Sequence, residues 1–206
     1  LDGYNTLDAI VWQAEAGHSG EVIHITRALS DFFRISLSSG ADWIPLAQEL
    51  KHLSGYLSIQ KARYRDILNY VIDVPADLGE SYVLKLLLQP LVENAIYHGI
   101  KDRRGGGLIT VTGREDGGFL CFCVQDTGRG MTPDQLRDVR ARMRGELPPA
   151  YAPYANAGTG FGLNNVDRRI RLYYDQEEGL SIESGPEGTR VSFRVPRKTR
   201  EEIVDG

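Results

Sequence analysis

The sequence predicts an α+β fold, in which a helical hairpin precedes an α/β sandwich made of one mixed sheet with helices on one face. Residues 5–66 carry apolar side chains at helical spacing, and short strand-like runs interspersed with helices follow after Arg65. A doubly wound fold would show regular strand–helix alternation and a glycine-rich turn directly after its first strand. The sequence has neither feature, so the sandwich is the better prediction.

The hairpin is predicted from two amphipathic stretches. The first covers residues 5–37, where Gly17 and Gly20 interrupt the helical period. The second begins at Pro45, which fits the first turn of a helix, and carries a stripe of leucines through residue 57. Because one hairpin cannot cover both of its apolar stripes, we expect a homodimer through this hairpin.

Three units are expected along the chain: the helical dimerisation region at residues 1–66, the sandwich at 67–197 and a charged tail at 198–206. Residues 82–98 are predicted to form one long helix, which Pro90 kinks near its middle. Residues 131–157 are expected to form a mobile lid. Strands are expected at 67–74, 107–114, 119–125, 180–184 and 189–195, and further helices at 133–145 and 161–174.

Composition narrows the class of protein. The 206 residues carry a net charge of −4, which gives no reason to expect a broad nucleic-acid surface. No apolar run approaches 18 residues, so a membrane is expected only through a segment upstream of this fragment. Cys121 and Cys123 stand two positions apart in a strand-like run, so their side chains share one face; they are expected to be buried, apolar and reduced.

Three motifs have complementary chemistry. Asp126 opens a glycine-rich stretch at 126–130, a second glycine cluster lies at 158–162, and Glu93 and Asn94 stand upstream. A carboxylate can accept a hydrogen bond from an adenine amino group, and an amide oxygen can help to hold magnesium. Glycine-rich turns let the backbone approach phosphates. The three together predict a nucleotide site.

Residues 86–99, 126–130 and 158–165 resemble the N, G1 and G2 boxes of the superfamily that unites gyrase, heat-shock chaperones, histidine kinases and MutL. The stretch Leu-Gln-Pro-Leu-Val-Glu-Asn-Ala at 88–95, with His98-Gly99 after it, is similar to LytS/YesM-type sensor histidine kinases. The resemblance implies a Bergerat-type fold, Mg-ATP as ligand, a homodimer and a response-regulator partner. It also implies the cytoplasmic region of a bacterial sensor that a missing segment anchors to the membrane.

The resemblance also implies roles for single residues. Asp126 would bind the adenine amino group, Gly128 and Gly130 would form the turn around the nucleotide, and Asn94 would be a magnesium ligand. Glu93 would either bind a magnesium-bound water or pair with an arginine. His98 would either contact phosphate or cap the end of its helix.

The G2 box and a late strand complete the expected site. Its predicted nucleotide-binding residues there are Thr159, Gly160, Gly162, Leu163, Asn165 and Thr189. Backbone N–H groups at the start of a helix suit a triphosphate.

Two positions decide what kind of chemistry is expected. Hydrolysing members of the superfamily carry a glutamate four residues before the asparagine, where this sequence has Pro90, which cannot be a base. The acceptor histidine would fall at position 1, before Tyr4-Asn5-Thr6-Leu7, and that position is Leu1. We therefore expect a histidine kinase catalytic region without its acceptor. The alternatives are an ATPase switch and a non-catalytic nucleotide-binding regulator of the same superfamily.

Overall fold

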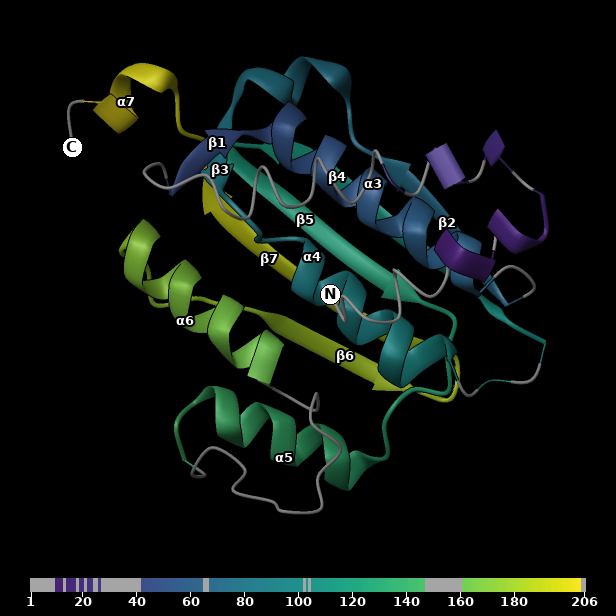
Figure 1. Cartoon of the computed structure of the whole chain (residues 1–206). Coiled ribbons are helices and arrows are strands. Elements are labelled where there is room, and N and C mark those ends of the chain that lie inside the picture. The colour runs from purple at the N-terminus through teal and green to yellow at the C-terminus, as the bar shows by residue number, and fades with distance from the viewer. Residues whose placement is uncertain are drawn as a thin grey trace.

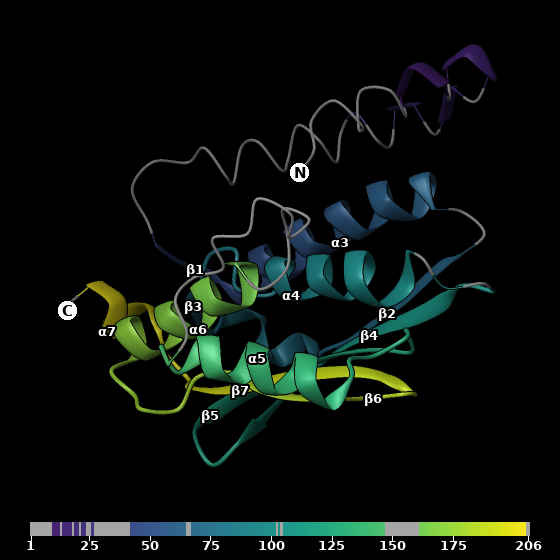
Figure 2. The ribbon, with the colours of Figure 1, turned by 90° about the horizontal axis from the view of Figure 1, so that it is seen from below.

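A single five-stranded sheet with helices on one face forms the body of the molecule (Figures 1 and 2). In Figure 2 the helices α3 to α6 lie above the sheet, which confirms the predicted sandwich. The computed structural model describes residues 10–12, 14–17, 19–20, 22–23, 26, 42–64, 67–101, 103, 105–146 and 161–204.

The sheet is mixed, as predicted. Its order is β2-β4-β5-β7-β6, in which β2 runs parallel to β4 and the other neighbours are antiparallel. Between β4 and β5 the chain turns at Gly117 and Gly118, whose φ angles of 60° and 82° suit a two-residue hairpin turn. The strands are β2 (Leu68–Asp73), β4 (Gly107–Asp116), β5 (Phe119–Asp126), β6 (Ser181–Gly185) and β7 (Gly188–Pro196).

The helices cover the apolar face of the sheet because every second side chain of its strands is buried there. The short strands β1 (Trp43–Pro45) and β3 (Tyr82–Leu84) form a separate two-stranded ribbon. The helices are α3 (Leu46–Arg63), η1 (Ala76–Glu80), α4 (Gln89–Asn94), the π-helix η2 (Ala95–Ile100), α5 (Pro133–Met143), α6 (Phe161–Tyr174) and α7 (Arg200–Val204).

The prediction of one kinked helix over residues 82–98 was wrong. Its first part is β3, which pairs with β1, and the helical part starts only at Gln89. Pro90 therefore lies in the first turn of α4, where its missing N–H removes no helical hydrogen bond and causes no kink. The helix then continues as the π-helical turn of η2, a rare form that often accompanies functional sites.

The first helix of the predicted hairpin is described only in part. Residues 10–12, 14–15, 19–20, 22–23 and 26 are helical, and Gly17 has a φ of 74° at the predicted interruption. Ile10 packs against Ile59 of α3, so the two predicted helices touch. Residues 1–9 and 27–41 lie outside the described residues.

The hydrophobic core is continuous from α3 to the sheet. Leu53, Tyr56 and Leu57 of α3 belong to the same buried cluster as Val111 of β4 and Val191 of β7. The unit boundaries at residues 66 and 197 stay predictions. Beyond the second of these, the backbone of Lys198 accepts a hydrogen bond from Tyr82 N at 2.8 Å, and α7 follows.

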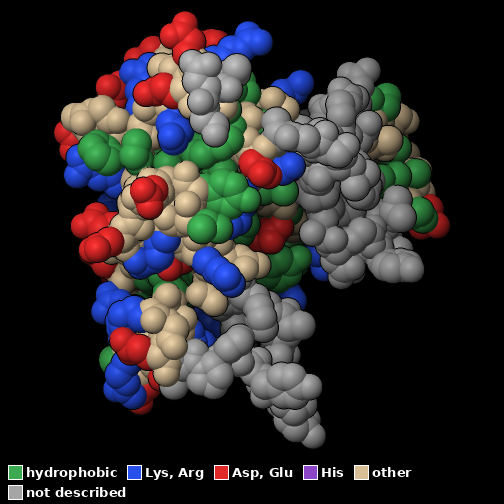
Figure 3. Space-filling view, turned by 90° about the vertical axis from the view of Figure 1, so that its left-hand side faces the viewer, with side chains coloured by type: hydrophobic (Ala, Val, Ile, Leu, Met, Phe, Trp, Pro, Cys, Tyr) green, Lys and Arg blue, Asp and Glu red, His purple; other side chains and the backbone are tan. Residues whose placement is uncertain are grey.

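The surface of the described residues mixes both signs of charge, as Figure 3 shows for one side of the molecule. Cys121 and Cys123 are free thiols on the sheet face away from the helices; they are half-buried, not buried as predicted. In the part of the chain that the structure describes, no helix combines the length and apolarity that crossing a membrane requires.

Helix α5 starts with a reciprocal cap that offers a test of the fold. The Thr132 hydroxyl accepts from Gln135 N at 3.3 Å, and Gln135 Oε1 accepts from Thr132 N at 2.9 Å. Thr132→Ala should lower the free energy of unfolding by about 0.5–2 kcal/mol, because an N-terminal backbone donor loses its acceptor. Denaturant titration measures this change, and Thr132→Ser, which keeps the hydroxyl, is the control. Equal stability of all three proteins would contradict the cap.

Candidate functional site

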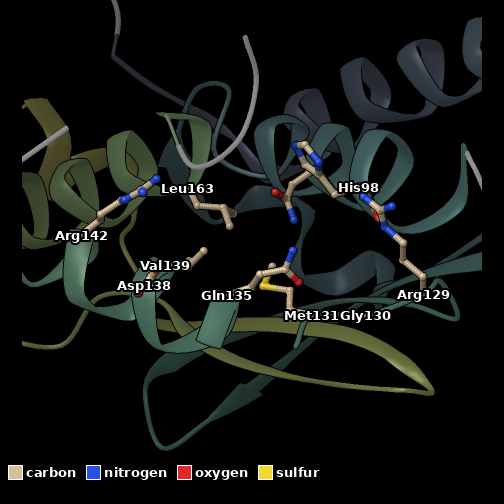
Figure 4. A pocket seen from close by; sticks show the side chains of 10 residues that line it. His98, Arg129, Gly130, Met131, Gln135, Asp138, Val139, Arg142 and Leu163 are labelled. Carbon is tan, nitrogen blue, oxygen red and sulfur yellow. The ribbon is translucent and has the colours of Figure 1, made fainter. Parts of the chain in front are cut away.

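A cavity of about 190 Å³ lies between α4–η2, the turn after β5, α5 and the start of α6. Four predicted site residues line it: Asn94, His98, Gly130 and Leu163. They come from three motifs that are far apart in the sequence, so the fold brings parts of all three together. Figure 4 shows His98 on one side of this cavity and Gln135 and Val139, on α5, on the other.

Asn94 and His98 reach the cavity from consecutive elements. Asn94 is the last residue of α4, and His98 lies in the π-helical turn of η2. Both side chains are half-buried and line the same cavity, as their spacing of one helical turn predicts. The His98 carbonyl accepts a hydrogen bond from Arg129 Nε at 3.1 Å, which ties η2 to the turn after β5.

Asp126 ends β5 beneath this turn and is only 3% exposed. Its Oδ1 accepts from Gly128 N at 2.7 Å. Burial raises the pKa of the Asp126 carboxyl, and the backbone N–H groups of Gly128 and Thr189 oppose the rise. A buried carboxylate of this kind gains from any further donor that reaches it, such as an exocyclic amine.

Glycine is required where the turn meets η2. A Cβ on Gly128 would lie 2.3 Å from Gly99 Cα, and one on Gly99 would lie 2.5 Å from Asp126 Oδ1. Gly130 has a φ of 65°, and its hypothetical Cβ would collide with the carbonyl oxygen of Gly185. The glycines therefore allow the backbone of the turn to pack directly on its neighbours.

Thr189 lies opposite Asp126 in the β5–β7 register and is 5% exposed. Its hydroxyl is 2.7 Å from that of Ser184, which in turn accepts from Met131 N at 2.8 Å. This short network fixes the turn after β5 to the β6–β7 hairpin. Ser184 is a part of the site that the sequence reading missed.

Glu93 does not line the cavity, although it is adjacent to Asn94. Its Oε1 accepts from Gln89 Nε2 at 2.7 Å, within the same helix. Glu93 instead lies near Tyr56 and Tyr97. Burial is the main cause that raises the pKa of both tyrosines, and the negative charge of Glu93 raises it further. The roles expected for Glu93 stay predictions.

The start of α6 brings two of its predicted residues to this region. Leu163 is buried and lines the cavity, and a Cβ on Gly162 would make ordinary contact with Pro90 Cβ at 3.6 Å. Asn165 is exposed on α6. Thr159 and Gly160 lie outside the described residues, as does the part of the expected lid beyond residue 146, so the lid stays a prediction.

The sequence reading also missed one wall of the cavity. Arg129 and Met131 come from the turn, and α5 supplies a whole helical face. The signal was present, because these α5 residues are spaced as one face of a helix that starts at Pro133. They are Gln135, Asp138, Val139 and Arg142. The described residues contain no group of three or more His, Cys, Asp or Glu that could hold a metal ion.

Comparison with protein families decides where this chain belongs. The family described as histidine kinase-, DNA gyrase B- and HSP90-like ATPase matches residues 79–199, and the histidine kinase family matches residues 4–68. The chain belongs to the histidine kinase-, gyrase- and HSP90-like ATPase family. Membership in this family implies ATP binding, and its matched range contains every described element of the cavity.

Curated relatives narrow this family assignment. The chain is 30% identical to the sensor histidine kinase BtsS of Escherichia coli over 95% of its length, covering 31% of the relative. It is 33% identical to the sensor protein LytS of Streptococcus agalactiae over 98%, covering 32%. The sensor histidine kinase YesM of Bacillus subtilis is 29% identical over 98%, covering 32%. The chain thus spans about a third of these relatives, and its similarity to LytS/YesM-type sensors is confirmed.

Solved structures of histidine kinase domains confirm the fold of this chain. The histidine kinase domain from the blue-light activated histidine kinase EL346 of Erythrobacter litoralis superposes with a TM-score of 0.53 at 19% identity, over 95% of this chain and 85% of that one. The catalytic domain of histidine kinase ThkA gives 0.53 at 16% identity, over 78% and 97%.

Proposed function

We propose that this region binds Mg-ATP and transfers the γ-phosphate to a histidine, for relay to a response regulator. The observation that supports this most is the single cavity lined by Asn94 and His98, by Gly130 and by Leu163. These residues stem from the three motifs that resemble the N, G1 and G2 boxes. Relatives that are named sensor histidine kinases and that match 95% and 98% of the chain support the same choice.

Asp126 selects adenine in this proposal. Its carboxylate accepts from the exocyclic amino group, whereas guanine would present a carbonyl oxygen and be repelled. Gly128 N already occupies one lone pair of Oδ1, which fixes the orientation of the carboxylate. Thr189, opposite Asp126 in the sheet, keeps this end of the strand pair in register.

Asn94 holds the magnesium ion, since its amide lines the cavity and magnesium takes few protein oxygens beside phosphates and water. When bound, the ion neutralises charge on the phosphates. Arg129 and Arg142, which also line the cavity, bring positive charge to its two ends (Figure 4). His98 contacts a phosphate from the same wall as Asn94. Backbone N–H groups at Thr159, Gly160 and Gly162, with Asn165, complete the phosphate site.

Pro90 favours transfer of the phosphate to a protein side chain over hydrolysis. It occupies the place of the glutamate that activates water in hydrolysing relatives, in the first turn of α4. Proline has no group that could take a proton from water, so this position cannot activate water for hydrolysis. A histidine side chain is therefore the better acceptor of the phosphate. We place that acceptor in the hairpin of a homodimer, before Tyr4, in a cytoplasmic region of a membrane-anchored bacterial sensor.

Two proteins test this proposal with γ-labelled ATP. The first is the chain itself, and the second carries Leu1→His, Asp2→Phe and Gly3→Leu with an added helical segment ahead of them. The first should bind ATP without labelling itself, and the second should acquire a label. The label should be acid-labile, because protonation activates the nitrogen of a phosphohistidine as leaving group. Acid-labile labelling of the first protein would identify another acceptor, and an unlabelled second protein would favour a non-catalytic regulator.

A further inference from the structure

Two oppositely charged side chains hold the segment Lys85–Leu88, which leads into α4. Glu49 of α3 accepts from three successive backbone N–H groups: its Oε2 from Leu86 at 2.9 Å, and its Oε1 from Leu87 and Leu88 at 2.8 and 3.0 Å. Arg169 of α6 donates to the carbonyls of the same segment, at 2.8 Å to Lys85 and 3.2 Å to Leu86.

The segment is strained between these two anchors. Leu86 has a φ of 56°, in the left-handed region that residues with a Cβ rarely adopt. Such a conformation persists only where the surroundings over-determine it, and strain of this kind is concentrated at functional positions. Glu49 and Arg169 supply that constraint from two different helices.

Glu49 is completely buried, and its carboxylate binds the backbone of this segment inside the core. Burial raises the pKa of the Glu49 carboxyl, while the three N–H donors and the charge of Arg169 oppose the rise. The donors it satisfies lie directly before α4, and the last of them, Leu88, is the N-cap residue of that helix. A residue 37 positions away from Leu86 therefore fixes where α4 begins.

The start of α4 determines where Asn94 lies. Helix α4 spans only Gln89–Asn94, so a shift at Leu88 displaces Asn94 with it. The adenine end of the site has supports of its own: Asp126 ends β5 and is held by Gly128 N and by the β5–β7 pairing, although Gly99 of η2 also packs against it. Loosening the segment should thus affect one half of the site and leave the other half unchanged.

We propose that Glu49, together with Arg169, is a positioning residue for Asn94. Through it the helix α3, the second helix of the predicted hairpin, sets the placement of the magnesium and phosphate half of the site. This inference rests on the proposed function of the same cavity. It adds a connection by which a movement of α3 changes phosphate binding without changing adenine recognition.

Glu49→Gln tests the inference, because glutamine keeps one acceptor oxygen and turns an NH₂ group towards the N–H donors. Asp167→Asn is the matched control. Asp167 is a buried carboxylate of α6 that accepts from Leu180 N at 2.7 Å and from Arg171 at 2.8 Å, away from α4. Arg169→Met is a second test, since Arg169 is only half-buried and its loss leaves Glu49 with its three backbone N–H donors.

The measurements are amide hydrogen exchange of the whole chain without nucleotide and calorimetric affinity for ADP with and without magnesium. In Glu49→Gln and Arg169→Met the amides of 86–96 should exchange about tenfold faster, while β4 and β5 stay unchanged. The gain in ADP affinity that magnesium gives should fall by about tenfold, while the magnesium-free affinity stays the same. Asp167→Asn should alter neither quantity.

Equal losses with and without magnesium, or faster exchange throughout the sheet, would show a merely structural role and overturn the inference. So would unchanged exchange at 86–96 in Arg169→Met, even if Glu49→Gln failed to fold. A wild-type chain that binds no adenine nucleotide would refute the proposed function instead, and the positioning of Asn94 would fall with it. Wild-type binding with unaltered magnesium dependence in the Arg169 variant would refute the positioning alone.

Discussion

Asp126→Asn should weaken the binding of adenine nucleotides by about 1–3 kcal/mol, the loss expected when a charged hydrogen-bond partner is removed. The geometry predicts the direction. Gly128 N needs an acceptor at 2.7 Å, so the asparagine oxygen will face it. The NH₂ group then points to where the adenine amino group binds, and two donors meet.

Calorimetry with ATP and GTP measures this effect. The wild-type chain should prefer ATP, and the variant should lose most of that preference. Asp116→Asn is the control, because Asp116 is exposed at the far end of β4 and its change should leave both affinities unaltered. Equal affinity of the wild-type chain for ATP and GTP would refute the assignment of Asp126.

Gly128→Ala should reduce both stability and nucleotide affinity. The new Cβ would lie 2.3 Å from Gly99 Cα, and backbone atoms cannot move aside as a flexible side chain can. Overpacking of this kind lowers the free energy of unfolding by about 1–3 kcal/mol. The turn must also move away from η2, which changes the position of Asp126 relative to His98.

Gly185→Ala is the matched control, since nothing lies within 4 Å of its Cβ position and its φ is not positive. Denaturant unfolding gives the change in stability, and calorimetry with ADP gives the change in affinity. The Gly185 variant should match the wild type in both measurements. A Gly128 variant that unfolds and binds like wild type would mean that the turn does not pack on η2.

The sequence predicted the elements whose signals are local. Asp126 ends a strand with clean alternation and its glycines follow directly, and α6 has the predicted bounds of 161–174. The fold class followed from the order of such elements. Local signals also placed Asn94 and His98 one helical turn apart, and both line the cavity.

Non-local contacts explain what the sequence reading missed. The start of α4 depends on Glu49 in another helix, and β3 exists only because β1 pairs with it. The spacing of apolar residues within 82–98 carries no information about Glu49 or β1, which lie elsewhere in the chain. The α5 wall was missed for a different reason. Gln135 and Arg142 reach the cavity only because the turn after β5 places their helix beside η2.

The parallel pairing of β2 with β4 makes the segment that carries Asn94 and His98 a crossover between two strands. During synthesis, β2 therefore has no sheet neighbour until the ribosome has released β4, because its partner is more than thirty residues ahead. Until then the start of α4 can pack only against elements that precede β4, such as α3. The site is thus complete only late in translation, after β5 and β7 have supplied its adenine half. A nascent chain should therefore not bind nucleotide before all strands of its sheet have paired.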